Sequence, residues 1–287
     1  MDRRKFLKLG ALTGAVAPAA VVRSVQAAAD EEAYPDFLGM LIDTTRCIGC
    51  QSCEAACAAE NGLTYPAIGP QPVNEDRPTD VDQYTIVNRF DTSAGPVWVK
   101  KACNHCSQPA CATACLVNAM EKTPQGPVIW HKNRCLGCRY CMIACPFEVP
   151  KFEYDKAFPL ITKCTLCYEN RTSKGLPTAC SEACPQKAIV FGTRRELHEE
   201  AWRRISTNPE AYEHHLYGSR EVGGTEVMYL APCDFEELAF RDDLGSQPYS
   251  EMTREFLYAV PMVITILPAL LFGISQAGKE DKKEDAP

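Results

Sequence analysis

Short apolar runs along this chain predict a few strands, each placed beside a group of polar and cysteine residues. Residues 39–43 and 126–131 are apolar runs of strand length, and each leads into closely spaced cysteines. Residues 188–192 form a similar run directly after another such group. A helix is predicted over about 195–207, followed by irregular structure. Because strand, cysteine loop and short helix recur, the chain contains an internal repeat.

The longest apolar run lies near the end of the chain. The segment 256–277 is 22 residues long and carries no charged residue, so it is long enough to cross a bilayer as a helix. Pro261 and Pro268 would kink that helix, and spanning helices tolerate such kinks. We therefore expect one transmembrane helix over 256–277 and a cytoplasmic tail over 278–287. A buried core helix is the alternative, although it usually has a polar face.

The N-terminal segment has the features of an export signal. Arg3 and Arg4 are consecutive, Phe-Leu-Lys follows, and an apolar stretch then runs to Val22. Small residues at 25–27 offer a cleavage point. Residues 1–27 are therefore predicted to be a twin-arginine signal peptide, with an amphipathic helix as the alternative. We expect the body to lie at the periplasmic face of the cytoplasmic membrane, held there by the single C-terminal span.

Composition changes this outline in two respects. The chain has 287 residues and a formal net charge of −7. It has no basic run in its body, so a nucleic-acid partner is not expected. The apolar fraction of 46% is raised by the two ends and by 17 cysteines, an unusual number for a chain of this length.

Sixteen of these cysteines form four groups of four with short, regular spacing. The spacing is C-x2-C-x2-C-x3-C in the first and third groups, C-x2-C-x4-C-x3-C in the second and C-x2-C-x12-C-x3-C in the fourth. The groups are Cys47, Cys50, Cys53 and Cys57; Cys103, Cys106, Cys111 and Cys115; Cys135, Cys138, Cys141 and Cys145; and Cys164, Cys167, Cys180 and Cys184. Four thiolates bind one 4Fe–4S cluster, and this spacing is typical of bacterial ferredoxins. The sequence therefore predicts four 4Fe–4S clusters and an electron-transfer protein.

Other uses of the cysteines fit less well. Zinc ribbons use pairs of C-x2-C with longer gaps, without a fourth cysteine at x3 followed by proline. Disulfides form outside the cytoplasm, but four groups of near-equal spacing make a poor disulfide framework. Cys233 lies far from the groups, and we expect it to be a buried apolar residue without a ligand role.

Two-cluster ferredoxins exchange the last cysteine of each run between neighbouring clusters, and the same exchange is expected here. Cluster one is predicted to use Cys47, Cys50, Cys53 and Cys184, and cluster two Cys57, Cys164, Cys167 and Cys180. Cluster three is predicted to use Cys103, Cys106, Cys111 and Cys145, and cluster four Cys115, Cys135, Cys138 and Cys141. The sixteen cysteines are the iron ligands in this prediction, and no residue is predicted to be catalytic.

The predicted fold class is α+β, with two pseudo-symmetric ferredoxin-like lobes of two clusters each, a C-terminal extension and the transmembrane helix. The first lobe combines residues 38–62 and 160–195, and the second comprises 96–159. Residues 63–95, rich in proline and acids, are expected to form a surface insertion, and 196–255 an extension that contacts partners.

Beyond the cysteines, several segments are similar to one known family. These are 38–41, 138–142, 192–197, 215–218 and 223–225, which read LGML, CRYCM, GTRREL, HLYG and GGT. The chain resembles the four-cluster electron-transfer subunits of membrane-bound respiratory oxidoreductases, and especially the iron–sulfur protein of hydrogenase-2-type nickel–iron hydrogenases. The resemblance implies a catalytic partner, namely hydrogenase large and small subunits, and an integral membrane subunit that reacts with quinone. It implies no active site in this chain.

Two alternatives to this function remain. One is the same role in a formate dehydrogenase or another molybdenum or tungsten oxidoreductase. The other is a membrane-tethered ferredoxin-like carrier without a fixed partner. The chain has no dinucleotide or phosphate-binding motif and no nucleophile–histidine–acid grouping that would indicate an enzyme.

A few further residues could influence the clusters. His105 lies between two cysteines and could tune a cluster or simply shape its loop. Arg46, Arg134, Lys151 and Lys163 lie beside the cysteine groups and could raise cluster potentials, although solvated surface positions are the alternative. His214 and His215 are expected at a surface or interface.

Overall fold

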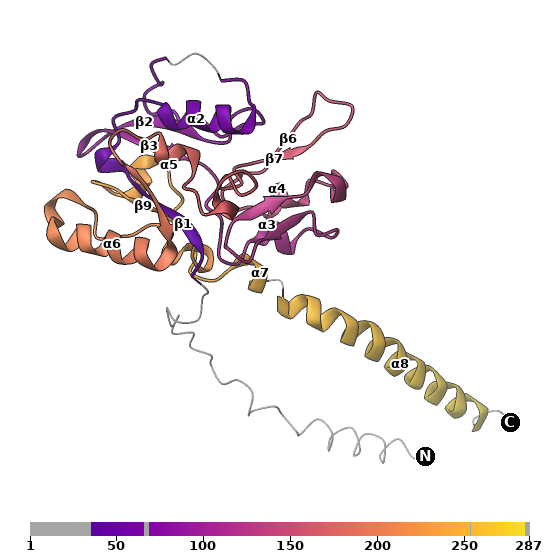
Figure 1. Ribbon diagram of the computed structural model, residues 1–287. Helices are drawn as coiled ribbons and strands as arrows, with labels where there is room; N and C mark the ends of the chain where they lie inside the picture. The colour runs from indigo at the N-terminus through magenta and orange to yellow at the C-terminus, as the bar shows by residue number, and fades with distance from the viewer. Residues whose placement is uncertain (1–35, 66–68, 253, 285–287) are drawn as a thin grey trace. The chain divides into compact units, whose positions relative to one another are not determined.

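The computed structural model describes residues 36–65, 69–252 and 254–284 (Figure 1). The predicted export signal over 1–27 lies outside these residues. The described part combines α-helices of very different lengths with small sheets. The largest sheet has three strands, and the other sheets have two strands each.

The three-stranded sheet has β1 (Leu38–Asp43) at its centre. Strand β8 (Ile189–Thr193) pairs with β1 in antiparallel register, so both predicted strands are confirmed. Strand β9 (Val227–Leu230) pairs with the other edge of β1 in parallel register. β9 was not predicted, because its residues lie in a segment that the sequence pattern describes as irregular. The segment after residue 207 therefore contributes to the core of the sheet.

One face of this sheet packs against helix α6 (Arg194–Thr207), close to the predicted range of 195–207. Side chains of β1 and β9 alternate between the two faces of the sheet, and Leu41 and Met228 lie on the α6 side. The helix begins with a capping box, in which the Thr193 hydroxyl accepts a hydrogen bond from the backbone N–H of Glu196. The Glu196 carboxylate in turn accepts one from the backbone N–H of Thr193. This cap fixes where the strand ends and the helix begins.

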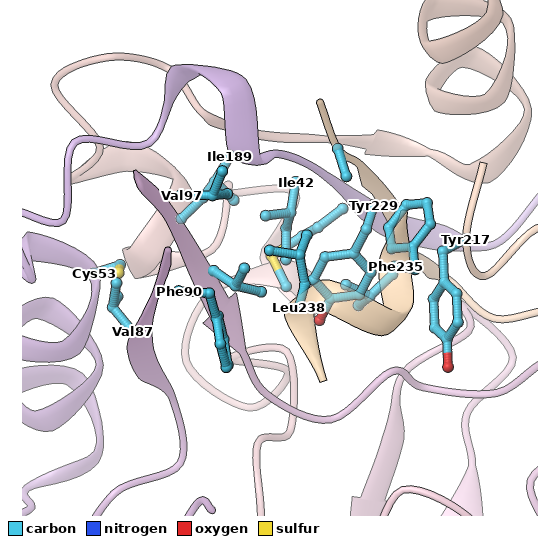
Figure 2. Close-up of a cluster of buried hydrophobic side chains, with 14 of the residues drawn as sticks. Ile42, Cys53, Val87, Phe90, Val97, Ile189, Tyr217, Tyr229, Phe235 and Leu238 are labelled. Carbon is cyan, nitrogen blue, oxygen red and sulfur yellow. The ribbon is translucent and has the colours of Figure 1, made fainter. Parts of the chain in front are cut away.

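The opposite face packs against a hairpin formed by β2 (Ile86–Thr92) and β3 (Gly95–Lys101). Figure 2 shows Val87, Phe90 and Val97 of the hairpin in the same apolar cluster as Ile42 and Ile189 of the sheet. The cluster also contains aromatic and aliphatic residues from the C-terminal segment, among them Tyr217, Tyr229, Phe235 and Leu238. Much of β2 is thus buried, although 63–95 was expected to be a surface insertion.

The remaining elements are short and surround the cysteine groups. The helices are α2 (Ser52–Asn61), α3 (Ala110–Thr113), α4 (Tyr140–Ala144), α5 (Ala179–Glu182) and α7 (Tyr249–Met252). The two-stranded sheets pair β4 (Met120–Lys122) with β5 (Val128–Trp130), and β6 (Lys151–Phe152) with β7 (Ile161–Thr162). Short 3-10 turns are η2 (Thr44–Arg46), η3 (Lys132–Arg134), η4 (Thr172–Lys174), η5 (Pro209–Ala211), η6 (Glu221–Gly223) and η7 (Phe235–Leu238). α2 packs on α5, and α3 packs on α4.

The internal repeat is visible in the backbone of the first and third cysteine loops. Gly49 and Gly137 occupy the same position in the two loops and have φ values of 68° and 69°. Two residues later, Gln51 and Arg139 have φ values of 58° and 61° and each precedes a short helix. Equal spacing therefore produces equal loop conformations in two segments that are far apart in the sequence.

The prediction of a transmembrane helix over 256–277 is wrong. These residues lie within helix α8 (Arg254–Glu284). A spanning helix needs about 20 consecutive, predominantly apolar residues. Of the helices that the structure describes, none is both long enough and apolar enough to cross a membrane. The membrane-anchored part of the predicted architecture is therefore withdrawn.

Candidate iron–sulfur cluster sites

One cavity is lined by four cysteines that come from widely separated parts of the chain. Cys57 of α2 lies there with Cys164, Cys167 and Cys180, and Met40 of β1 also lines the cavity. The Sγ atom of Cys180 lies 3.7 Å from the sulfur of Met40. The four cysteines are the set predicted for cluster two.

A second cavity is lined by the set predicted for cluster one, namely Cys47, Cys50, Cys53 and Cys184. Cys53 and Cys57 lie one turn apart on α2, yet they line different cavities. The helix thus presents one cysteine to each cavity, which is the arrangement that exchange of ligands between neighbouring clusters requires.

The second lobe groups its cysteines in a corresponding way. Cys145 has Cys103 as a charged neighbour, and both lie close to the thiols of Cys106 and Cys111. Cys141 has a different set of neighbours: Cys115, Cys135 and Cys138. The last cysteine of each run therefore lies beside the opposite group, as it does in the first lobe.

Backbone N–H groups donate hydrogen bonds to several of these sulfurs. In the loops, Gly137 donates to Cys135 Sγ over 3.4 Å and Leu166 donates to Cys164 Sγ over 3.4 Å. After the last cysteine of a run, Ala119 donates to Cys115 Sγ over 3.1 Å. Ala188 donates to Cys184 Sγ in the same way, over 3.3 Å. Hydrogen bonds to the sulfurs are one of the means by which a protein sets the potential of a cluster.

Burial affects the thiols more strongly than any other factor. It raises the pKa of Cys47 to about 11 and that of Cys164 to about 12, and neighbouring cysteines add to the increase. The pKa of Cys141 is raised to about 11 for the same reasons. A thiol binds iron as thiolate, so these groups must release protons when a cluster is inserted.

The donor sets suit a cluster better than a single ion. Within the described ranges, no group of three cysteine, histidine, aspartate or glutamate side chains is arranged to hold one metal ion. A cubane spreads its four ligand sulfurs around four irons, so they enclose a cavity instead of meeting at one point. Four cysteines around each of two cavities, with N–H groups directed at the sulfurs, fit that geometry.

The second and fourth cysteine groups approach each other where Cys103 contributes to the raised pKa of Cys164. Lys163 is buried at this contact, and its ammonium lies 3.8 Å from Cys103 Sγ. The same ammonium donates to the carbonyl oxygens of Val128 and Cys164. Of the four basic residues considered from the sequence, Lys163 is thus the one buried beside cysteines, whereas Arg46 and Arg134 are exposed and Lys151 is half-buried.

His105 is completely buried beside the second cysteine group. Its Nδ1 accepts the N–H of Val128 over 2.9 Å, so the ring proton is on Nε2. Burial, reinforced by the charge of Lys163, lowers the pKa of His105 well below its ordinary value. The ring is therefore neutral. It shapes the loop through Val128, and tuning of a cluster by His105 stays a prediction.

Two other sequence predictions can be compared with the structure. Cys233 is buried in the main apolar cluster, as expected for an inert residue. His215 is half-exposed, and its Nε2 lies 2.7 Å from Glu221 Oε1. Its side chain therefore forms an ion pair when protonated.

Lys100 was missed by the sequence reasoning. It is only 2% exposed, and it lines both first-lobe cavities. Although burial opposes protonation, the neighbouring side chains of Cys180 and Cys53 raise the pKa of Lys100. A lysine in a strand usually points to solvent, and Val97 and Val99 already mark the other face of β3 as buried. Only the proximity of a lysine to Cys103 in the sequence could have drawn attention to it.

Comparison with known proteins agrees with this geometry. The 4Fe–4S dicluster domain family matches residues 97–194. A protein from Nitratidesulfovibrio vulgaris (strain Hildenborough) is 44% identical, over 99% of this chain and 78% of the relative. The hydrogenase-2 operon protein HybA of Escherichia coli O157:H7 is 35% identical, over 99% of this chain and 97% of the relative. The iron–sulfur subunit of the nitrate-inducible formate dehydrogenase of Escherichia coli K12 is 33% identical, over 80% of this chain and 76% of the relative.

These matches agree with the cysteine groups in calling for multiple 4Fe–4S clusters. The similarity to HybA extends over nearly the whole of both chains, well beyond the cysteine-rich region. The chain belongs to the family of 4Fe–4S electron-transfer subunits that includes HybA and the formate dehydrogenase iron–sulfur subunits.

Proposed function

We propose that this chain is the electron-transfer subunit of a respiratory oxidoreductase and that it holds four 4Fe–4S clusters. The subunit relays electrons between a catalytic subunit and an integral membrane subunit that reacts with quinone. The observation that carries the proposal is the lining of two separate cavities by four cysteines each, drawn from both ends of the cysteine-rich region.

The ligand sets proposed are those predicted from the sequence. The two cavities support clusters one and two, and the neighbouring thiols of the second lobe support clusters three and four. When bound, each cluster supplies a site that gains and loses one electron. The protein holds the clusters in a fixed order, excludes water around the buried sulfurs and directs N–H groups at them.

The order of the groups defines a route for the electron. Clusters one and two share α2, which carries Cys53 and Cys57. Clusters two and three meet where Cys164 approaches Cys103. Clusters three and four share the contact between α3 and α4. Cys50 and Cys138 are exposed, so clusters one and four are the ones that partners can approach.

A periplasmic uptake nickel–iron hydrogenase is the catalytic partner that the relatives favour. HybA takes its name from a hydrogenase-2 operon, and the similarity spans almost the whole chain. A formate dehydrogenase is the second candidate, because iron–sulfur subunits of formate dehydrogenases are 33–34% identical over at least 67% of this chain. In both cases the substrate chemistry belongs to the partner and the role of this chain is the same.

Export by the twin-arginine pathway is part of the proposal. Arg3 and Arg4 and the apolar stretch that follows support it. A cluster protein acquires its iron and sulfide in the cytoplasm, and this pathway carries folded proteins across the membrane. The double variant Arg3→Lys and Arg4→Lys is expected to leave the protein in the cytoplasm with its clusters, and fractionation of cells measures this. Recovery of the variant in the periplasm would contradict the assignment.

Metal analysis of the complex that co-purifies with a tagged form of this protein tests the choice of partner. Nickel together with abundant iron supports the hydrogenase assignment. Molybdenum or tungsten would instead indicate a formate dehydrogenase or a related enzyme. Iron alone, with no second subunit, would refute both and indicate a free carrier.

The variant Cys138→Ser tests the relay itself. It is expected to damage one cluster, so that quinone-linked activity of the complex falls while dye-linked activity of the catalytic subunit survives. Cys233→Ser is the matched control, because Cys233 is buried but lines neither cysteine cavity. Loss of dye-linked activity with quinone-linked activity intact would show that electrons do not pass through this subunit.

A further inference from the structure

Among the residues that the structure describes, Lys100 is the one that lines both of these cysteine cavities. It lies in β3 opposite Val87 of β2, at the end of the hairpin that packs against the sheet. The side chain is only 2% exposed. Its charge interacts with Cys53, from the set of one cavity, and with Cys180 and Cys164, from the set of the other.

The ammonium group of Lys100 has no hydrogen-bond partner among the described residues. Within the same residues it forms no ion pair with a carboxylate. Glu54, whose pKa Lys100 lowers, is already engaged, because its Oε1 accepts the N–H of Val87 over 2.6 Å and lies 3.9 Å from Arg77. The Tyr229 hydroxyl donates to Asn104 over 3.3 Å. An unpaired buried charge is costly, so a negative partner is missing.

Lys163 provides a contrast, since it is also buried beside cysteines. Its ammonium donates to the carbonyl oxygens of Val128 and Cys164, which satisfy it without any cofactor. Lys100 has no such oxygens. A cubane with four thiolate ligands is anionic and becomes more so when reduced. Two such groups, one in each cavity, would supply the negative charge that Lys100 lacks.

From this placement we infer that Lys100 is a shared counter-ion that raises the reduction potentials of clusters one and two together. The inference rests on the proposed function, because it requires clusters in both cavities. When an electron passes between them, one cluster is oxidised and the other is reduced, and Lys100 exchanges neither an electron nor a proton. Its fixed positive charge stabilises the reduced form of each cluster.

The neighbouring lysine offers a matched control. Lys101 follows directly in β3, but its ammonium lies 2.6 Å from Asp76 Oδ1 and 2.9 Å from the Ala239 carbonyl oxygen. It lines neither cavity. Lys101→Met therefore removes one positive charge from the same strand without removing it from the cavities. Lys100→Met keeps the length and bulk of the side chain, and Lys100→Arg keeps the charge.

The test is a potentiometric titration, followed by electron paramagnetic resonance, of the full complex purified without oxygen. Iron and sulfide contents are measured first. In Lys100→Met, two of the cluster potentials are expected to become more negative and the other two to stay unchanged. In Lys100→Arg, the same two cluster potentials should stay close to their wild-type values. Lys101→Met should change none of the four potentials. The ligand variants Cys50→Ser and Cys167→Ser assign the two affected signals.

Several results would overturn the inference. Unchanged potentials in a fully loaded Lys100→Met protein would do so, as would an equal shift in Lys101→Met. If Lys100→Met and Lys100→Gln both lose iron while Lys100→Arg retains it, the need for charge at this position is upheld. If Lys100→Arg also loses iron, the side chain serves packing and the inference fails. A wild-type complex that holds no cubane clusters would instead refute the proposed function.

Discussion

Replacement of Gly49 by alanine tests whether the first cysteine loop depends on close contact with the hairpin. Gly49 has a φ of 68°, and an added Cβ would lie 2.3 Å from both Cδ1 and Nε1 of Trp98. Gly137 is the matched control. Its φ is 69°, and its added Cβ would lie 3.7 Å from Phe152, which is ordinary contact. The two substitutions therefore share the backbone strain and differ in the collision.

The magnitudes follow from these two costs. Alanine in the left-handed region costs about 1–2 kcal/mol at either position. The collision adds about 1–3 kcal/mol at Gly49, as overpacking generally does. Trp98 cannot easily withdraw, because the Arg89 guanidinium lies over its ring at 5.8 Å from the centroid. At about 3 °C per kcal/mol for a protein of this size, Gly49→Ala should melt roughly 3–9 °C below Gly137→Ala.

Both variants are compared in the cluster-loaded protein, by thermal melting at one fixed scan rate and by the rate of iron release to a chelator. A fixed scan rate is needed because loss of a cluster makes unfolding irreversible. Gly49→Ala should melt at the lower temperature and release iron faster. The double variant Gly49→Ala with Trp98→Ala removes the ring that collides, so its deficit relative to Trp98→Ala alone should fall to that of Gly137→Ala.

Equal melting temperatures for the two single variants would refute this reasoning. The reasoning would also be refuted if the loss of melting temperature in the double variant equalled the sum of the losses in the two single variants, because the collision with Trp98 would then contribute nothing. Either result would mean that the loop, and not the hairpin, absorbs the added methyl group.

Three further predictions concern other parts of the chain. Cys57→Ser should lower the iron content of the purified protein by about four irons, the content of one cubane, whereas Cys233→Ser should leave the iron content unchanged. Equal iron contents in the two variants would contradict the assignment of Cys57 as a cluster ligand. Thr193→Ala removes the capping hydroxyl of α6 and should lower stability by about 1 kcal/mol in thermal melts, with no change in iron. The hydrogen bond to Glu221 raises the pKa of His215. His215→Gln should therefore lower the melting temperature most below about pH 6.5, and the difference from the unmodified protein should fade as the pH rises through the raised pKa. A melting-temperature deficit that grows with pH would refute the pairing of His215 with Glu221.

Much of the local structure could be predicted from the sequence. The strands at 38–43 and 189–193 follow from short apolar runs, and helix α6 lies close to the range of 195–207 predicted for it. The spacing of the cysteines fixed the chemistry, because few cofactors other than 4Fe–4S clusters use four thiolates in that pattern. Membership of the family was also correctly inferred from the sequence.

Other features depended on contacts that no local pattern encodes. Strand β9 adds to the sheet only because β1 offers it a free edge, which lies about 190 residues earlier in the chain. The hairpin of β2 and β3 appears in the sequence as part of a proline-rich insertion, yet Val87 and Phe90 are buried against the sheet. The predicted membrane helix failed because a long uncharged run was taken as sufficient, and no described helix meets the requirements for a span.

The sequence by itself determined which residues can bind iron, because thiolate chemistry and loop spacing are local properties. It also determined where the two loops repeat, since Gly49 and Gly137 adopt the same conformation for the same local reason. Only the tertiary structure decided which lysine lies beside the cysteines of both cavities. Lys100 reaches both cavities because the hairpin packs its strand against the sheet. The charge environment of a buried site depends on neighbours that are distant in sequence, and only the fold brings them together.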